Sequence, residues 1–271
     1  PSEVPGRGLD ENENDLFTAK MDIEEFISKF KLDSQESLVF KSTRPTKLEF
    51  HFVRYANGYT DFLRALEEFN NFIKDLIIKE NPRFSNYIND VHHVTLQINA
   101  RSILVENPAS VLIAIMRVLI SIAGNGNPFK EKLRHLLVIS TDIGEHFQGQ
   151  WNQILSRFNN LEVLELIEDM MSLNSDDYNL AHYPVPQYTS WPPQLKELSI
   201  NDNYFQIISK DFLQSLPRLL EKLLIAGNYI VTLGYFDQEI DLGECMPHLQ
   251  AMNLSRNKHL SRINPRIFDS C

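Results

Sequence analysis

One spacing of apolar and polar residues recurs along the second half of the chain. Leucine-like residues stand at the first, fourth and sixth positions, and asparagine stands at the ninth. The segments that match are 195–203, 220–228 and 249–257, with Ile at the sixth position of the first two and Met252 at the fourth position of the third. Three matches to a four-position spacing indicate an internal repeat.

Weaker copies continue the series toward the N-terminus. Residues 161–169 carry Asp at the ninth position, residues 133–141 carry Thr there, and residues 91–99 keep the Asn. A seventh copy covers 46–53, where Leu48, Phe50 and Phe52 alternate with polar residues. Successive copies from residue 91 onward begin 25 to 42 residues apart, so the segment between the repeating positions varies in length.

The alternation at the fourth and sixth positions predicts a short strand with one buried face in each copy. Strands of successive copies then stack in parallel, because the chain returns to the same side of the sheet after each copy. The ninth-position asparagine can satisfy backbone groups where the chain leaves the strand, and Asp or Thr can replace it there.

Helical periodicity predicts how the chain returns between strands in the N-terminal half. Apolar residues recur at helical spacing over 58–80, over 107–122 and over 147–158. Asn107 and Pro108 form a helix start, with Asn as the N-cap and Pro at the first helical position. The returns of the C-terminal half, 210–216 and 235–246, are shorter, and we expect 3₁₀ or irregular structure in them.

Three regions follow from these patterns. Residues 1–15 are polar, with Gly and Pro, and are expected to form a tail or linker. Residues 16–44 are expected to hold an N-terminal capping helix, since 22–30 begins like a capping box and carries an apolar stripe. This stripe either packs on the first repeat or docks on a partner. Residues 45–271 form the repeat domain.

The three clearest copies resemble the leucine-rich-repeat family at every fixed position of its L-x-x-L-x-L-x-x-N pattern. The resemblance implies an α/β fold, the leucine-rich-repeat solenoid, with a curved parallel sheet. It implies helices on the convex face in the N-terminal half and short irregular or 3₁₀ returns in the C-terminal half. It also implies that the strands line a concave surface used for binding.

Composition narrows the partners and the compartment. The formal net charge is −10 and the pI is about 5.3, so the chain repels phosphate backbones and we expect neither nucleic acid nor an anionic membrane as a partner. No apolar stretch is long enough to span a membrane. The two cysteines, Cys245 and Cys271, form no disulfide framework. A reducing compartment, cytoplasmic or nuclear, is therefore expected.

Motifs that carry catalysis are absent from the sequence. No phosphate-binding loop, dinucleotide fingerprint, nucleophile elbow or zinc-protease helix is found. His92 and His93 are adjacent in a predicted strand and point to opposite faces, which does not suit a metal pair. The sequence therefore predicts a protein that is not an enzyme, with no catalytic residue, metal or cofactor.

Binding residues are expected at the positions of each copy that lie on or beside the concave surface, because the fourth and sixth positions already carry the fold. The alternative for any one of them is a plain solvated side chain. An acidic block in the middle would suit a basic partner. The candidates are His93, Arg134, Glu162, Glu165, Glu168, Lys196, Asn201, Glu221, Asn253 and Arg256.

A second candidate surface is the long segment 172–193, which lacks strand or helix periodicity and holds several aromatic residues among four prolines. Tyr183 and Trp191 are the expected anchors, since Tyr and Trp are enriched at interface hot spots. The alternative is that this loop only packs over the edge of the array.

The resemblance extends to the substrate-binding region of F-box leucine-rich-repeat proteins, especially fungal ones, and implies a protein-binding role in a ubiquitin ligase. In that family an F-box segment binds the adaptor subunit of a cullin ubiquitin ligase. Residues 1–44 carry no F-box pattern, so the resemblance places that segment before Pro1. The alternative is a scaffold or regulatory adaptor without ubiquitin, such as a phosphatase regulator, an RNA export or splicing factor, or a bacterial effector.

Overall fold

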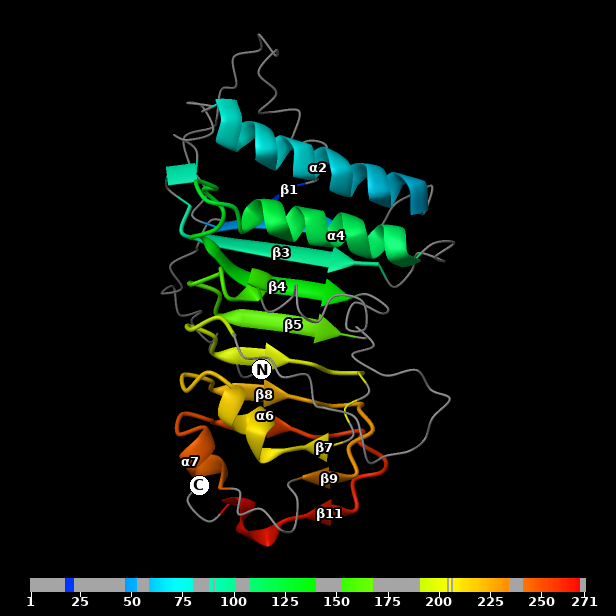
Figure 1. The fold of residues 1–271 in the computed structure, drawn as a ribbon, viewed down its shortest axis with the longest axis vertical. Coiled ribbons are helices and arrows are strands. Elements are labelled where there is room, and N and C mark those ends of the chain that lie inside the picture. The colour runs from blue at the N-terminus through cyan, green and yellow to red at the C-terminus, as the bar shows by residue number, and fades with distance from the viewer. Residues whose placement is uncertain are drawn as a thin grey trace, which may run out of the picture.

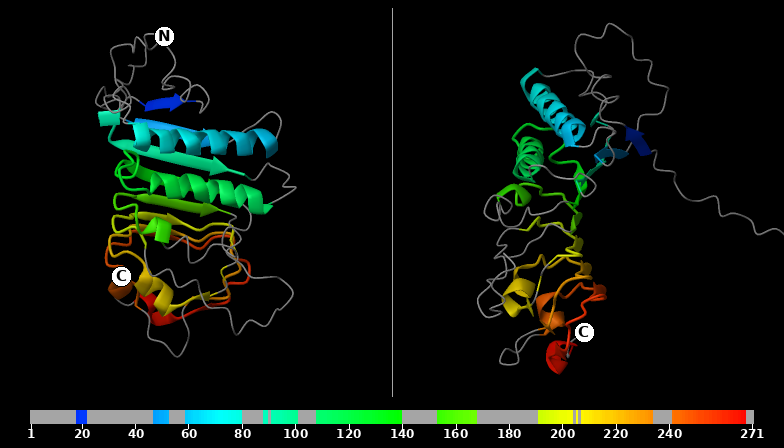
Figure 2. Two further views of the ribbon diagram at one scale, coloured as in Figure 1. Left: turned by 45° about the horizontal axis from the view of Figure 1, so that its top comes forward. Right: turned by 90° about the vertical axis from the view of Figure 1, so that its right-hand side faces the viewer.

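The structure of the chain is a computed structural model. It describes residues 18–21, 47–52, 59–79, 88–89, 91–100, 108–139, 153–167, 191–203, 205, 207–233 and 241–268. The described part is an α/β fold built on one parallel sheet, with its helices on one face (Figure 1, Figure 2).

The main sheet has eight strands, all parallel, in the order β1-β2-β3-β4-β5-β6-β8-β10. The six strands predicted from residue 91 onward all lie in it, and the seventh copy forms β2, so these predictions are confirmed. The bounds are β2 (Lys47–Phe52), β3 (His93–Asn99), β4 (Leu133–Ile139), β5 (Val163–Ile167), β6 (Glu197–Ser199), β8 (Lys222–Leu224) and β10 (Ala251–Asn253).

Strand β1 (Thr18–Met21) extends the sheet beyond the predicted strands and pairs with β2. It lies within the region where only a capping helix was expected, so that expectation was incomplete. The predicted tail at 1–15 and the predicted helix at 22–30 lie outside the described residues.

A second, smaller sheet, which the repeat pattern did not predict, joins the returns of the last three repeats. Its parallel strands are β7 (Ile207–Ile208), β9 (Thr232–Leu233) and β11 (Arg262–Ile263), in the order β11-β9-β7. Strands of two residues are too short to show any periodicity, which is why the hydrophobic pattern does not reveal them.

Two long helices cover one face of the N-terminal half, as predicted. They are α2 (Tyr59–Lys79) and α4 (Pro108–Ile122), with Pro108 at the first helical position. Its expected cap, Asn107, lies outside the described residues. Among the described helices, none is long and apolar enough to cross a membrane.

The remaining segments that connect the strands differ in part from the predicted secondary structure. Of the predicted helix at 147–158, residues 153–155 are helical and 147–152 lie outside the described residues. The short returns α6 (Lys210–Ser215) and α7 (Leu242–Cys245) are α-helical rather than 3₁₀ or irregular; only η1 (Pro265–Phe268) is 3₁₀ among the described elements. The reason is capping, because the side chains of Ser209 and Asp241 accept hydrogen bonds from the backbone N–H groups of Phe212 and Gly243.

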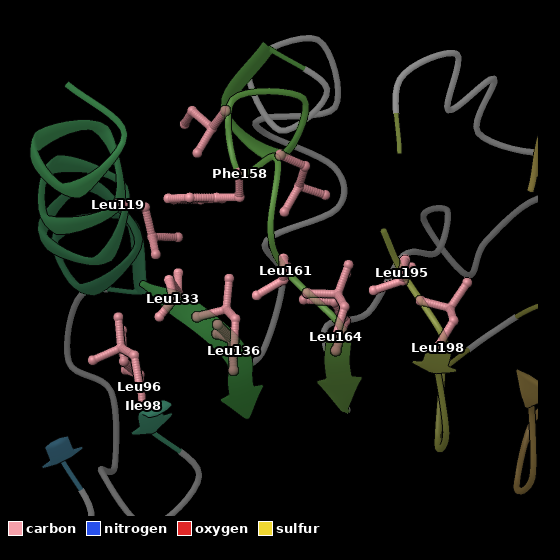
Figure 3. Packing of buried hydrophobic residues seen from close by; sticks show 14 of the residues in the cluster. Leu96, Ile98, Leu119, Leu133, Leu136, Phe158, Leu161, Leu164, Leu195 and Leu198 are labelled. Atoms are coloured by element: carbon pink, nitrogen blue, oxygen red, sulfur yellow. The ribbon is translucent and has the colours of Figure 1, made fainter. Parts of the chain in front are cut away.

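The core lies between the sheet and the helices. In the copies that begin at residues 91, 133, 161, 195 and 220, the side chains at the fourth and sixth positions are 0–2% exposed. Those of them that Figure 3 labels point to the helix-covered face. Around α2 the core is aromatic: the ring of Phe69 lies 5.2 Å from that of Phe50, 5.5 Å from that of Phe52 and 6.4 Å from that of Phe129.

Ninth-position asparagines form a ladder under the C-terminal half, and the role predicted for them is confirmed. The side-chain amides of Asn203, Asn228 and Asn257 are buried. Each donates a 2.9 Å hydrogen bond to the carbonyl of the sixth-position residue one copy earlier, which is Leu166, Ile200 and Ile225 in turn. These bonds satisfy carbonyl groups that the chain buries as it leaves each strand.

Candidate partner-binding face

The sheet face opposite the helices, here called the open face, carries every second residue of the strands. Its side chains are polar or charged in most strands, because the apolar residues of the repeat are committed to the core. From β2 to β10 they are Lys47, Glu49, His51, His93, Thr95, Gln97, Asn99, His135, Leu137, Ile139, Val163, Glu165, Ile167, Glu197, Ser199, Lys222, Leu224, Ala251 and Asn253.

Charged side chains pair across neighbouring repeats beside this face. The carboxylate of Glu162 lies 3.6 Å from Nε of Arg134 and 3.0 Å from Nζ of Lys196, so one acid bridges the bases of both adjacent repeats. All three residues occupy the second position of their copies. An alignment of the copies could therefore have predicted that these three side chains meet, whereas no single copy shows it.

A second cross-strand pair joins Lys222 and Glu197, at 3.0 Å. In a third, Nε2 of His135 lies 2.7 Å from Oε1 of Glu165. The predicted acidic block is thus only partly available to a basic partner, because Glu162 and Glu165 both have partners within the chain. The stacking of repeats brings these bases beside the acids, and whether a basic partner binds there stays a prediction.

Histidines concentrate at the N-terminal end of the open face. Nε2 of His51 lies 3.2 Å from Oε2 of Glu49, and Nε2 of His93 lies 3.2 Å from Oγ1 of Thr95. Burial lowers the pKa of His93, and the neighbouring Lys47 and His135 lower it further. His93 is therefore held as a neutral imidazole that can donate and accept hydrogen bonds.

Aliphatic residues interrupt the polar surface over the middle strands, and none of them was among the predicted binding residues. Leu137 and Ile139 on β4 and Val163 and Ile167 on β5 are only partly buried. Ile139 and Ile167 are paired in register. Strict alternation from the buried Leu136 and Leu164 would have placed all four on this face. The middle of the face thus combines apolar surface with paired charges, a composition typical of protein interfaces.

The structure gathers five of the predicted residues on neighbouring strands or just before them: His93, Arg134, Glu162, Glu165 and Lys196. Glu221 is partly buried at the second position of the next copy. Glu168 and Tyr183, with nearly all of the 172–193 loop, lie outside the described residues.

Other predicted residues have hydrogen-bond or ion-pair partners within the chain. The Asn201 amide donates to Oγ of Ser199 at 2.8 Å, and its Oδ1 accepts from the N–H of Ala226 at 2.7 Å. The exposed Asn253 accepts from the N–H of Ser255 at 2.9 Å. Arg256 is exposed and pairs with Asp202 at 3.1 Å, near the C-terminal end.

Trp191 is a correction, because it was expected to anchor a partner, and its burial fits the alternative of packing over the array. Its side chain is 8% exposed and belongs to the hydrophobic core, with Nε1 3.5 Å from Oγ of Ser215. A large ring next to the start of a repeat gains more by covering the core than by facing water. The residues around Trp191 show no periodicity from which its burial could be inferred.

Potential metal ligands do not cluster in the described ranges, where no group of three or more His, Cys, Asp or Glu residues is placed to hold a metal ion. Cys245 is the cysteine that these ranges include. Burial raises the pKa of its thiol, which favours the protonated form at neutral pH.

No family model matches the chain, and a search of curated proteins finds no match.

Proposed function

We propose that the chain is a leucine-rich-repeat solenoid that binds a partner protein on its open face, as the substrate-recognition part of an F-box ubiquitin ligase. The repeat spacing and the order of the strands support the solenoid. One observation carries the binding role: the helices and the core occupy one face of the sheet, whereas the other face presents aliphatic and charged side chains in register. Solenoids use such surfaces to hold other proteins.

The partner contact is centred on β3, β4 and β5. There Leu137, Ile139 and Ile167 supply apolar area, while His93 and the His135–Glu165 pair supply directed polar groups. Because the nearby carboxylates already have basic partners, the interface depends on shape and apolar contact more than on net charge. The role is one of binding rather than catalysis, and the compartment we propose is the cytoplasm or the nucleus.

Site-specific photo-crosslinking tests this role. A photoreactive benzoyl-phenylalanine replaces Gln97 on the open face, and the matched control replaces Lys74, which is exposed on α2. We expect a discrete crosslinked protein from position 97 in cells and none of it from position 74. The same proteins crosslinked at both positions would place the interface elsewhere.

The ubiquitin role is tested separately. We expect the full-length protein to co-purify with the adaptor subunit of a cullin ubiquitin ligase, and the crosslinked protein to accumulate when the chain is deleted. Stable levels of that protein, without adaptor binding, would favour the alternative of a scaffold or regulatory adaptor outside the ubiquitin pathway.

A further inference from the structure

On the open face, the carboxylate of Glu165 lies among aliphatic side chains. Leu137 is its neighbour in register on β4, and Val163 and Ile167 lie two residues to either side of it on β5. All four side chains are partly buried. Figure 3 labels the residues just before Leu137 and Glu165, and both point to the helix-covered face, which leaves Leu137 and Glu165 on the open one. Glu165 is therefore an acid within the apolar part of the open face.

One oxygen of this carboxylate has a partner. Nε2 of His135 lies 2.7 Å from Oε1 of Glu165, and in the described part of the chain the Glu165 side chain has no other hydrogen-bond or ion-pair partner. A histidine is charged only when it is protonated, so His135 does not supply a permanent cation. The Glu165 side chain is 25% exposed, so a donor from outside the chain can reach it and bind at Oε2.

The other acids on the strands of this face each lie beside a lysine. Oε1 of Glu49 is 3.0 Å from Nζ of Lys47, and Oε2 of Glu197 is 3.0 Å from Nζ of Lys222. Among the described strands, Glu165 is thus the open-face acid without a permanent cation beside it.

A partner protein that covers these aliphatic side chains also covers Glu165. The carboxylate then loses its water, and its burial without a counter-charge is costly. A cationic side chain with an aliphatic stem meets both demands, because its methylene groups can pack on Leu137 and Ile167 while its charged end reaches the carboxylate. The surroundings of Glu165 therefore favour a lysine or an arginine of the partner.

His135 distinguishes between these two cations. A guanidinium pairs best with a carboxylate through two parallel hydrogen bonds, one to each oxygen. At Glu165 that arrangement would have to displace His135 from Oε1. An ammonium group is a compact charge that needs a single acceptor, and Oε2 provides one. The arrangement therefore favours lysine.

We propose that Glu165 is a specificity-determining residue of the open face and binds a lysine side chain of the partner protein. The stem of that lysine lies over Leu137 and Ile167, and its ammonium group donates to Oε2. His135 is a positioning residue, because it holds Oε1 and so disfavours arginine. This inference rests on the function proposed above and names the partner side chain that the open face selects.

The probe for the test is the protein captured by crosslinking at position 97, whose binding to the chain with its natural Gln97 is measured by calorimetry. Glu165→Gln should weaken binding at least tenfold, because the amide keeps the shape of the side chain but not its charge. The matched control is Glu221→Gln, which removes the same charge from a partly buried acid just before β8. It should change binding less than twofold.

Acetylation of amines with a limiting amount of acetic anhydride, followed by mass spectrometry, identifies the lysine. One lysine of the partner should be protected by the wild-type chain and not by Glu165→Gln. Changing that lysine to Glu should weaken binding at least tenfold, and Glu165→Lys in the chain should restore it to within threefold of wild type. Changing it to Arg should weaken binding at least threefold to the wild-type chain, but less than twofold to His135→Ala, in which both oxygens are open.

Each failure has a distinct meaning. Wild-type affinity of Glu165→Gln, with crosslinking at position 97 intact, would overturn this inference and leave the proposed function standing. The absence of any crosslinked protein at position 97 would overturn both. Equal losses for Glu165→Gln and Glu221→Gln would indicate long-range attraction instead of contact. Dependence on Glu165 without a protected lysine would show that the partner supplies an arginine or an uncharged donor, and equal binding of the Lys and Arg versions to the wild-type chain would remove the role of His135.

Discussion

The two halves of the sheet close their core in different ways. In the first half, β3 and β4 have seven residues each, or roughly 23 Å at about 3.3 Å per residue, and α4 has 15 residues, or roughly 22 Å. In the second half, β6, β8 and β10 have three residues each, or about 10 Å, and α6 has six residues, or about 9 Å. The helices α4 and α6 are therefore about as long as the strands of their halves.

The chemistry of the core changes with this length. Where long helices cover the sheet, large apolar side chains such as Phe50 and Phe69 fill the space. Where returns are short, backbone carbonyls at the ends of the strands accept hydrogen bonds from the buried side chains of Asn203, Asn228 and Asn257. Packing should thus dominate the stability of the first half, and buried hydrogen bonds should contribute more in the second.

The largest expected effect comes from the aromatic core under α2. Phe69→Ala should destabilise the protein by about 3–5 kcal/mol, because it leaves a cavity among three rings. The matched change, Phe212→Ala, removes a ring whose centroid lies 5.7 Å from that of Phe205 in the second half. We expect it to cost roughly 1–2 kcal/mol less, since each aromatic pair adds about 0.5–1.5 kcal/mol. Urea unfolding measures both, and an equal or reversed order would break the comparison.

The asparagine ladder gives the next largest effect. Asn228→Ala should cost about 2–3 kcal/mol, because it removes the partners of two buried backbone groups, the Ile200 carbonyl and the Phe205 N–H. Asn253→Ala is the control, since Asn253 is exposed and bonds only locally to Ser255 in the described structure. A loss below about 0.5 kcal/mol for Asn228→Ala would show that water replaces the amide and that the ladder is not structural.

Much of this architecture could be predicted from the sequence, because the repeat positions carry both burial and register. Leu198, Leu223 and their counterparts fix the strand, and the face follows from alternation. The periodicity also located α2 and α4. Strands β1, β7, β9 and β11 could not be predicted in this way, because they have two to four residues and no repeating pattern.

The candidate site was less predictable than the fold, for a physical reason. Whether a charged side chain is available to a partner protein depends on the residues beside it. The residues beside Glu162 come from the preceding and the following copies, and the spacing between copies varies along the chain. Trp191 shows the same limit, since its burial depends on Ser215 and on core residues distant in sequence. Residues chosen singly by position could not reveal these contacts.

Two left-handed glycines, one in each half, separate backbone strain from crowding. Gly126 has φ +79° and nothing within 4 Å of the place that a Cβ would take, whereas Gly227 has φ +67° and lies under the Asp202–Arg256 ion pair. A Cβ at Gly227 would overlap the Asp202 carboxylate. Gly126→Ala should cost about 1 kcal/mol for the strained φ, and Gly227→Ala should cost about 2 kcal/mol.

The control for the glycine pair is Asp202→Ala. Asp202→Ala removes the carboxylate that a Cβ at position 227 would overlap. In that background, Gly227→Ala should lower the free energy of unfolding by about as much as Gly126→Ala does. Thermal unfolding of the four variants measures this. If Gly227→Ala costs no more than Gly126→Ala in the presence of Asp202, the ion pair does not hold the carboxylate over the glycine.

The smallest effect concerns the boundary between the halves, where Glu162 joins Arg134 at the start of β4 to Lys196 just before β6. The side chains of Arg134, Glu162 and Lys196 are 24%, 39% and 48% exposed, so water and salt screen their attraction. Glu162→Gln should therefore cost less than about 1 kcal/mol, and the loss should shrink in 1 M salt, where the Debye length is only about 3 Å. A double-mutant cycle with Lys196→Met isolates the pair.

A small coupling energy would mean that the halves are joined by the packing of Leu161, Leu164 and Leu166, which are 0% exposed. A coupling above about 2 kcal/mol would mean instead that the charges hold the boundary, and the trio would then be too strongly committed to the fold to serve a partner.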